Sequence, residues 1–195
     1  MTTSIWWVRH GPTHSKAAVG WTDLPADLSD VDALQRLGNY LPSNASIVSS
    51  DLKRASTTAD ALQGDRLRLT DSTALREMNF GDWEDRLFAD IAKTDRVTSR
   101  KFWDAPGAVS APNGESWNDL SARVSKAVDG VIASHGIEDV IIVAHFAVIL
   151  TALQRATGMP AKAAFSFKID NLSVTRMDFV HESNSWRVHG VNHLP

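Results

Sequence analysis

Two runs of apolar residues stand out along the chain, and each ends on a histidine. Residues 5–8 (Ile-Trp-Trp-Val) precede Arg9 and His10, and residues 140–144 (Val-Ile-Ile-Val-Ala) precede His145. Strands that are buried on both faces of a sheet carry such continuous apolar runs. The pattern predicts two buried strands with a histidine at each carboxyl end, which is where ligands bind in open α/β sheets.

Apolar residues that recur every three or four positions predict helices between and after these strands. The expected helices cover 31–41, 52–62, 116 to Gly136, and His145 to Gly158, with two short ones near 87–92 and 102–103. Further strands are expected at 45–49, at 66–69 on an edge, and at 172–180 and 186–191 as an antiparallel hairpin. This order predicts an α/β fold with a mostly parallel central sheet and an antiparallel edge.

Residues 71–115 form an irregular segment that is long for a simple connection. Within a compact domain, such a segment usually covers a functional site or carries helices of its own. The full length of 195 residues is ordinary for one domain. We therefore predict a single domain over 1–195, with 71–115 as a covering segment.

Composition narrows the chemistry. The chain has no cysteine, which excludes thiol nucleophiles, disulfides and thiolate metal sites. Its formal net charge of -3 gives no electrostatic basis for binding nucleic acid or an anionic membrane. The longest apolar run, 140–150, is too short to span a bilayer, and the first residues lack the pattern of a signal peptide. We expect a cytoplasmic protein without nucleic-acid or membrane partners.

Arg54 is a third candidate at a strand end. It lies in the first turn of the helix predicted at 52–62, and helix N-termini favour anions. Taken alone, Arg54 is more simply a solvated helix cation and His10 a structural histidine. If the predicted strands are neighbours, Arg9 and Arg54 can both bind phosphate oxygens. A neutral histidine whose second ring nitrogen donates a hydrogen bond can then attack phosphorus.

With these residues in place, the chain resembles the histidine phosphatase superfamily, which also contains cofactor-dependent phosphoglycerate mutase. Five blocks follow in the family's order, and the similarity extends to Asn171-Leu172-Ser173. The blocks are Arg9-His10-Gly11-Pro12-Thr13, Ser49 to Ala55, Leu75 to Glu84, Asn113-Gly114-Glu115-Ser116, and Val143-Ala144-His145. The resemblance implies a three-layer α/β/α arrangement with a covering insertion over the site.

The resemblance also implies roles for the matching residues. His10 attacks the substrate phosphorus and is transiently phosphorylated. Arg9, Arg54 and His145 bind the phosphoryl oxygens and stabilise their charge. Glu77, which alone reads as a solvated loop carboxylate, protonates the leaving alkoxide and later activates water. Neither a metal nor another cofactor is expected, because arginine and histidine supply the positive charge.

Thr13, in the block that begins at Arg9, and the N–H of Phe146 are also expected to bind the substrate. The chain departs from the family's pattern at three positions. Lys16 stands where the family usually has asparagine, and it either reaches phosphate as a point charge or is simply exposed. Phe146 and Asp85 replace glycines, and at Phe146 this alters how closely the backbone approaches phosphate. These changes point to a distinct substrate or a weakened enzyme.

Two more acidic residues and several aromatic ones have structural interpretations. Glu84 is expected at the start of the following short helix, and Glu115 to support the pocket or a helix end. Most aromatic residues around the covering segment are expected in a small core, with one or two at the entrance to select an apolar leaving group. They are Trp83, Phe88, Phe102, Trp103 and Trp117.

The sequence favours a phosphomonoesterase acting on a small soluble phosphate ester. A phosphoglycerate mutase-type phosphotransferase is less favoured, because the chain lacks room for the longer insertions expected there. A non-catalytic domain that binds phosphorylated ligands fits the departures at Lys16, Phe146 and Asp85, but His10 and Glu77 argue against it. A protein phosphohistidine phosphatase is disfavoured by the long cover. Assembly as a homodimer stays open.

Overall fold

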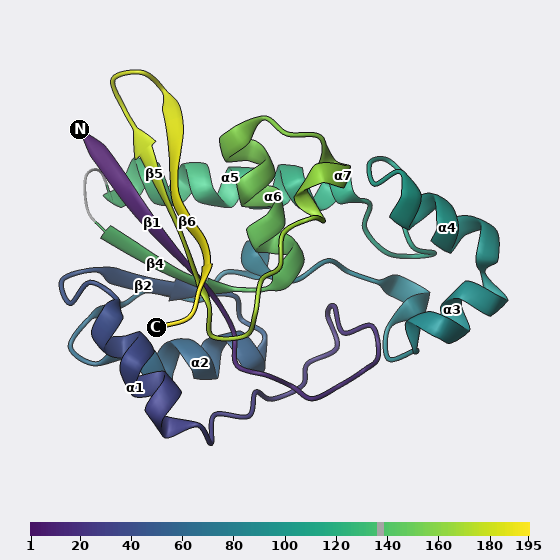
Figure 1. Ribbon diagram of the computed structural model, residues 1–195, viewed down its shortest axis with the longest axis horizontal. Helices are drawn as coiled ribbons and strands as arrows, with labels where there is room; N and C mark the ends of the chain where they lie inside the picture. The colour runs from purple at the N-terminus through teal and green to yellow at the C-terminus, as the bar shows by residue number, and fades with distance from the viewer. Residues whose placement is uncertain (136–138) are drawn as a thin grey trace.

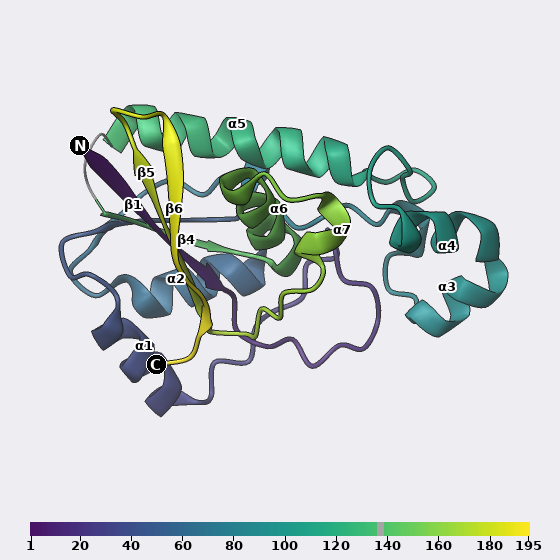
Figure 2. The ribbon, with the colours of Figure 1, turned by 45° about the horizontal axis from the view of Figure 1, so that its top comes forward.

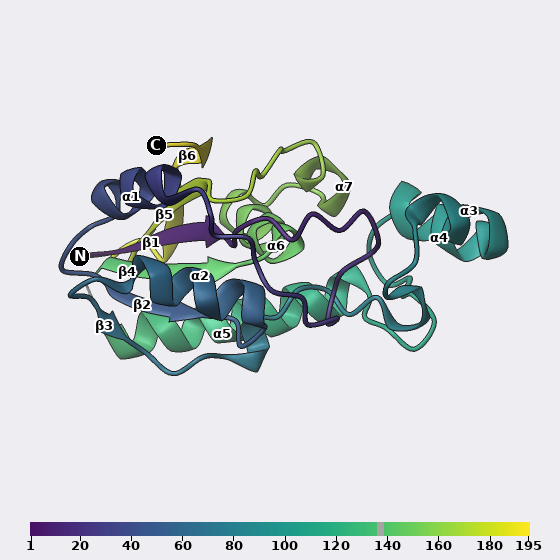
Figure 3. The ribbon, with the colours of Figure 1, turned by 90° about the horizontal axis from the view of Figure 1, so that it is seen from below.

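The protein is built on a six-stranded sheet. The structure is a computed structural model and describes residues 1–135 and 139–195. The strands are β1 (Thr2–Arg9), β2 (Ser46–Ser49), β3 (Leu67–Arg68), β4 (Asp139–Ala144), β5 (Val174–Val180) and β6 (Ser185–His193). Their order across the sheet is β3-β2-β4-β1-β5-β6 (Figure 1, with β3 labelled in Figure 3). The first four are parallel, β5 is antiparallel to β1, and β6 is antiparallel to β5.

Helices cover both faces of this sheet (Figures 1 and 3). They are α1 (Val31–Tyr40), α2 (Lys53–Gln63), α3 (Phe88–Thr94), α4 (Arg96–Asp104), α5 (Trp117–His135), α6 (Phe146–Thr157) and α7 (Ala161–Ala164). Two single 3-10 turns, η1 (Thr73–Leu75) and η2 (Gly81–Trp83), lie between β3 and α3. Apolar side chains of α1 and α2 form one cluster with the sheet, and those of α5 and α6 form another.

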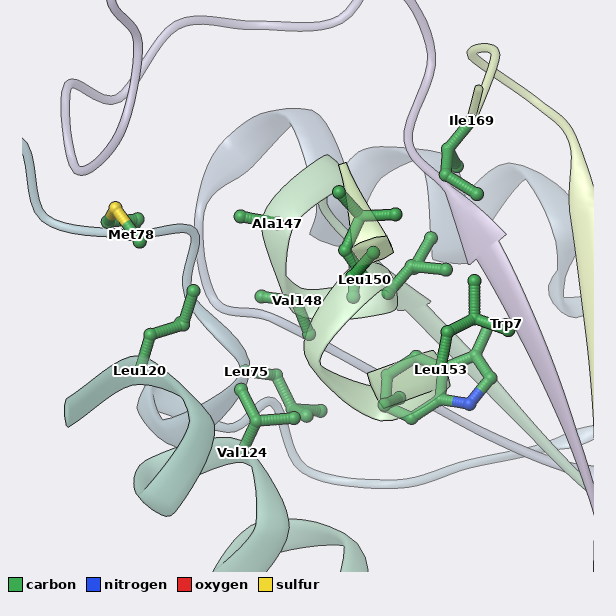
Figure 4. Close-up of a cluster of buried hydrophobic side chains, with 14 of the residues drawn as sticks. Trp7, Leu75, Met78, Leu120, Val124, Ala147, Val148, Leu150, Leu153 and Ile169 are labelled. Atoms are coloured by element: carbon green, nitrogen blue, oxygen red, sulfur yellow. The ribbon is translucent and has the colours of Figure 1, made fainter. Parts of the chain in front are cut away.

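The apolar runs of β1 and β4 are explained by the helices that cover both faces of the sheet. In β4, Ile141 and Val143 pack toward α1 and α2, whereas Val140 and Ile142 pack toward α5 and α6. Because side chains of a strand alternate between the two faces, a strand covered on both faces is apolar throughout. Figure 4 shows residues of the second cluster, among them Trp7 of β1, Leu75, Val124 of α5 and Val148 of α6. The predicted three-layer fold is confirmed.

The helices and strands follow the sequence pattern closely. Gly158 ends α6 in the left-handed conformation, with φ of 69°, as the sequence predicted. The predicted helix end at Gly136 lies outside the described residues. The short α7 was missed, because four residues carry no readable period. Among the described helices, none combines the length and the apolar character that crossing a membrane requires.

The pair formed by α3 and α4 stands apart from the sheet, at the right of Figures 1 and 2. Both helices belong to the 71–115 segment, and the loop that follows β1 runs between them and the sheet (Figure 3). Ala17 of this loop and Leu87, just before α3, form an isolated antiparallel bridge. The loop and the helical pair are therefore joined directly, beyond the end of β1.

Candidate active site

A cleft of about 460 Å3 opens beyond the carboxyl end of β1. Most residues that the sequence singled out lie in its wall, namely Arg9, His10, Thr13, Lys16, Arg54, Glu77 and Phe146. The wall also contains Ser15, Ala17, Val19, Met78, Phe80, Phe88, Trp103, Ala147 and Phe165, most of which the sequence did not indicate as site residues. His145 is fully buried behind this wall.

The register of β1 and β4 explains why two histidines that are distant in sequence meet. The strands are parallel neighbours in which Arg9 pairs with Ala144, so His10 and His145 each follow directly at the paired ends. The His10 N–H donates to the Ala144 carbonyl at 3.0 Å. The ring centroids of His10 and His145 lie 5.0 Å apart, edge to face.

The His10 ring is fixed in one neutral tautomer. Its Nδ1 lies 2.6 Å from the Gly11 carbonyl oxygen. A carbonyl can only accept, so Nδ1 carries the proton and the lone pair of Nε2 is left free. The residue is 6% exposed, and burial together with the nearby Arg54 lowers the pKa of His10 to about 3. At neutral pH the imidazole is therefore uncharged, which is the form that a nucleophile requires.

Contacts from distant segments hold the backbone around His10. The Asn171 side-chain amide donates to the His10 carbonyl at 2.7 Å, and the Gly11 N–H donates to Thr58 Oγ1 at 3.0 Å. A Cβ on Gly11 would lie 2.6 Å from Leu28 Cδ2 and 3.1 Å from the Asp27 carbonyl oxygen, so a larger residue would require the Leu28 side chain to move. Sequence reasoning assigned no role to Thr58 or Asn171. Thr58 was detectable as the residue one helical turn after Arg54.

Both arginines are anchored to backbone carbonyls before any ligand binds. Arg54, 1% exposed in the first turn of α2, donates to the Gly20 carbonyl at 2.6 Å and the Thr22 carbonyl at 2.9 Å. Arg9 donates to the Ile169 carbonyl at 2.5 Å, and its guanidinium lies 5.5 Å from the centre of the Phe146 ring. Burial lowers the pKa of both side chains, but arginine stays charged in proteins. The cleft therefore holds two fixed positive charges.

Several buried polar atoms beside the cleft have no hydrogen-bond partner among the described residues. They include Arg9 Nε and both ring nitrogens of His145. Buried donors and acceptors are normally paired, because an unpaired one costs about 1–3 kcal/mol. Burial also lowers the pKa of His145 well below its usual value, so its ring is neutral and has one N–H to donate. These donors suit an anion with several oxygens.

Glu77 is the one acidic residue in the described lining of the cleft, and it is 7% exposed. It accepts hydrogen bonds from the Met78 N–H at 2.9 Å and from the Ala147 N–H at the start of α6, at 3.2 Å. Burial raises the pKa of Glu77, and these N–H groups and Arg54 only partly oppose it. Glu77 therefore keeps a proton to a higher pH than an exposed glutamate does, as a general acid must.

Arg123 of α5, which the sequence did not single out, supports the segment that carries Glu77. Its guanidinium forms a two-point ion pair with Glu115, at 2.8 and 2.7 Å. It also donates to the carbonyls of Ala74, Arg76 and Glu77, at 3.0, 2.9 and 3.3 Å. Glu115 in turn accepts from the Asn79 N–H at 2.9 Å. The expectation that Glu115 supports the pocket remains a prediction, for which this pair supplies a physical basis.

Replacing Arg123 with methionine is expected to lower both stability and activity. The change leaves Glu115 mostly buried without its partner, which we expect to lower the unfolding free energy by about 2–3 kcal/mol. Because Glu77 then loses its fixed position, we expect kcat to fall about tenfold or more. Urea unfolding measures the loss of stability, and a pH–rate profile measures the effect on catalysis. The fall in rate at high pH should move to a different pH, because the pKa of Glu77 depends on its position.

Arg155→Met is the matched control for this substitution. Arg155 of α6 also joins an ion pair, with Asp129, and donates to the Ser125 carbonyl of α5. Its loss should lower the unfolding free energy by about 1 kcal/mol or less and leave kcat unchanged. If Arg123→Met keeps the wild-type kcat and pH profile, Arg123 serves stability only.

One expectation around the cover is wrong, and one departure from the family pattern has a structural basis. The expected position of Glu84 at a helix start is wrong, although its role is structural as expected. Its carboxylate accepts from the N–H groups of Gly20, Trp21, Thr22 and Phe80 and from the Thr22 hydroxyl. It thereby fixes the loop that anchors Arg54. Asp85 has φ of 59°, a conformation that favours glycine and that aspartate tolerates, so this departure from the family pattern is accommodated locally.

Comparison with known proteins agrees with this geometry. Residues 5–193 match the family described as the histidine phosphatase superfamily (branch 1). The chain is 27% identical over 190 residues to adenosylcobalamin/alpha-ribazole phosphatase of Escherichia coli (strain K12), across 94% of each chain. It is also 27% identical over 192 residues to a protein of Proteus mirabilis (strain HI4320) named probable phosphoglycerate mutase GpmB, across 95% of this chain and 88% of that one. A mycobacterial glucosyl-3-phosphoglycerate phosphatase structure superposes with a TM-score of 0.84 at 27% identity, across 98% of this chain and 99% of that one.

Proposed function

Because the chain belongs to the histidine phosphatase superfamily (branch 1), we propose that it hydrolyses a small phosphate ester through a phosphohistidine on His10, with Glu77 as proton donor. That it is a phosphatase follows from the family and from relatives named as phosphatases of small esters. One observation carries the proposed chemistry. The 2.6 Å hydrogen bond between His10 Nδ1 and the Gly11 carbonyl leaves Nε2 free in a cleft that also holds Arg9, Arg54 and Glu77.

In the first half of the reaction, the lone pair of His10 Nε2 attacks phosphorus, and the bond from phosphorus to the ester oxygen breaks. Charge spreads over the phosphoryl oxygens, where Arg9 and Arg54 stabilise it from positions that are fixed in advance. We assign the unpartnered N–H of His145 to the same oxygens. Glu77 gives its proton to the leaving oxygen, so the alcohol departs uncharged.

In the second half, the Glu77 carboxylate takes a proton from water, and the water oxygen attacks the phosphorus of the phosphohistidine. The bond between nitrogen and phosphorus breaks, inorganic phosphate leaves, and the lone pair returns to Nε2 of His10. Both halves rely on the positive charge of Arg9 and Arg54. We therefore propose that the reaction needs no metal ion.

The sequence also made predictions about further binding residues, domain organisation, location and partners, and these are compatible with the proposed function. Thr13, Lys16 and Phe146 line the cleft and are proposed to contact the substrate, with Lys16 as an exposed point charge. We also propose that 1–195 is a single domain in which 71–115 covers the site, since Glu77 and Trp103 come from that segment. A cytoplasmic location, the lack of a nucleic-acid partner and assembly as a homodimer stay predictions.

A second candidate function is phosphotransfer of the phosphoglycerate mutase kind, which the likeness to the Proteus mirabilis protein favours. The two functions share the phosphohistidine and differ in the acceptor, because a second substrate oxygen takes the place of water in a mutase. A domain that binds phosphorylated ligands without turnover would share the cations of the cleft and lack both steps.

A panel of phosphomonoesters assayed with a metal chelator present separates these functions. We expect release of inorganic phosphate with kcat/KM of about 10⁴ M⁻¹ s⁻¹ or more for the best ester, unaffected by the chelator. Isomerisation of phosphoglycerate that outpaces phosphate release from every ester would instead establish a mutase. Tight phosphate binding with no turnover of any ester at several pH values would establish a binding domain.

A further inference from the structure

Much of the cleft is apolar and serves none of the steps above. Its volume of about 460 Å3 lies within the range of roughly 300–1,000 Å3 typical of small-molecule sites, and a phosphoryl group fills only part of it. The larger apolar side chains of the wall are Met78, Phe80, Phe88, Trp103, Phe146 and Phe165. An alcohol group that fills the rest of the cleft would lie against these side chains.

Trp103 is the centre of an aromatic group in this wall. Its ring centroid lies 5.7 Å from that of Phe88 and 6.0 Å from that of Phe165, with interplanar angles of 77° and 84°. The three rings come from α4, α3 and the residue after α7, so the contact with Phe165 joins the separate helical pair to the main body (Figures 1 and 2). Such edge-to-face contacts are favourable and hold the rings at fixed angles.

Trp103 and Phe88 line the cleft and leave part of their apolar surface exposed, shared between the cleft and a neighbouring hollow. Trp103 is 39% exposed and Phe88 44% exposed, whereas Trp83 and Trp117, at the same end of the molecule, are almost fully buried. Covering apolar surface is favourable by about 25 cal/mol per Å2, and a further ring can add edge-to-face contacts to the same group. A flat aromatic substituent therefore gains more here than a small polar alcohol does.

Charge in the cleft argues against a second anionic group on the substrate. Arg9 and Arg54 are assigned to the phosphoryl oxygens, and Lys16 is the one further basic residue in the described lining. The lysine is exposed on a loop, which leaves it well hydrated. Arg96 and Arg100 line a neighbouring hollow that shares Phe88 and Trp103 with the cleft. Within the described lining, a carboxylate on the alcohol would therefore have only the hydrated Lys16 as a further cation, because Arg96 and Arg100 line the neighbouring hollow and not the cleft.

Building on the phosphatase function proposed above, we propose that the substrate is the phosphate ester of an uncharged alcohol with an aromatic ring, which packs against Trp103, Phe88 and Phe165. Phosphorus then lies at His10, and the ring lies against the aromatic part of the same cleft wall. Trp103 is the specificity residue of this site, since it contacts both of the other rings.

Three esters of similar primary alcohols test the preference without a large difference in leaving-group chemistry. They are 2-phenylethyl phosphate, n-propyl phosphate and the phosphate ester of 3-hydroxypropanoate. We expect kcat/KM for the phenylethyl ester to exceed that for the propyl ester by about tenfold or more, the effect of one buried apolar group. The carboxylate ester should be no better than the propyl ester. Trp103→Ala should lower the phenylethyl-to-propyl ratio of kcat/KM at least fivefold.

Val97→Ala is the matched control, because Val97 lies on the same helix, is largely exposed and is outside the cleft wall; the ratio should stay at its wild-type value. If Trp103→Ala does not fold, the phenylethyl-to-propyl ratio of kcat/KM is measured for Phe88→Leu instead, and it should also decrease. Equal kcat/KM for all three esters would overturn the aromatic site while leaving the phosphatase function intact. Failure to hydrolyse any ester would instead count against the phosphatase function.

Discussion

Replacing His10 with alanine is expected to reduce kcat on the order of 10⁴-fold or more, whichever phosphate ester is used. The substitution removes the atom that bonds to phosphorus, and the cations that remain can only assist slow direct attack by water. The fold should survive, because the contacts that hold this segment are made by the backbone of His10 and Gly11. Initial rates of phosphate release, with circular dichroism to verify folding, measure the effect.

His14→Ala provides a matched histidine control. His14 lies four residues further along the same loop, is exposed and pairs with Asp27 at 2.8 Å, and it does not line the cleft. We expect its activity to stay within about twofold of the wild type, as for a surface substitution. Activity of His10→Ala within tenfold of the wild type would show that another residue is the nucleophile.

Replacing Glu77 with glutamine is expected to lower kcat/KM for alkyl phosphates by about 10²–10⁴-fold, the contribution typical of a general acid. The loss should be smaller for 4-nitrophenyl phosphate, whose leaving group departs without a proton. Because glutamine cannot activate water either, that substrate should give a burst of one nitrophenol per chain followed by slow turnover. Rapid-mixing absorbance measurements resolve the burst from the slow phase.

The pH dependence of the wild type should carry the signature of Glu77. Only the protonated carboxyl group can donate, so kcat/KM for alkyl esters should fall as pH rises through the pKa of Glu77. Since burial raises that pKa, the fall should occur above the range of an exposed glutamate. Glu77→Gln should lose this limb, and Glu182→Gln, at an exposed position, should keep it. If Glu77→Gln showed the same fall in kcat/KM with rising pH, that fall would come from the titration of another group.

The fold was predictable because its main signals are local. The two apolar runs identified the central strands β1 and β4, and the histidine after each run identified the end of the sheet that carries the cleft. Convergence of Arg9 and His10 with Arg54 required that β1, β4 and β2, the strand before Arg54, lie side by side with their carboxyl ends at one edge. β4 pairs with both of the other strands, Ala144 with Arg9 of β1 and Val143 with Ser49 of β2, and so satisfies that condition.

What the sequence could not predict depends on contacts between distant segments. No local pattern indicates that Arg123 donates to the Glu77 carbonyl or that Asn171 donates to the His10 carbonyl. Glu84 was misplaced for the same reason, since its neighbours suggest a helix start while its donors come mainly from residues 20–22. The tautomer of His10 likewise depends on a loop conformation that brings the Gly11 carbonyl back to Nδ1.

The central claim is that the phosphoryl group passes through a covalent bond to His10, and trapping that species tests it most directly. Glu77→Gln is mixed with excess 4-nitrophenyl phosphate carrying a labelled phosphoryl group, quenched in alkali, digested and mapped by mass spectrometry. We predict up to one phosphoryl group per chain on the peptide that contains His10, stable in alkali and lost in acid. Label on a different residue, or equal labelling of a Glu77→Gln chain that also carries His10→Ala, would contradict the account.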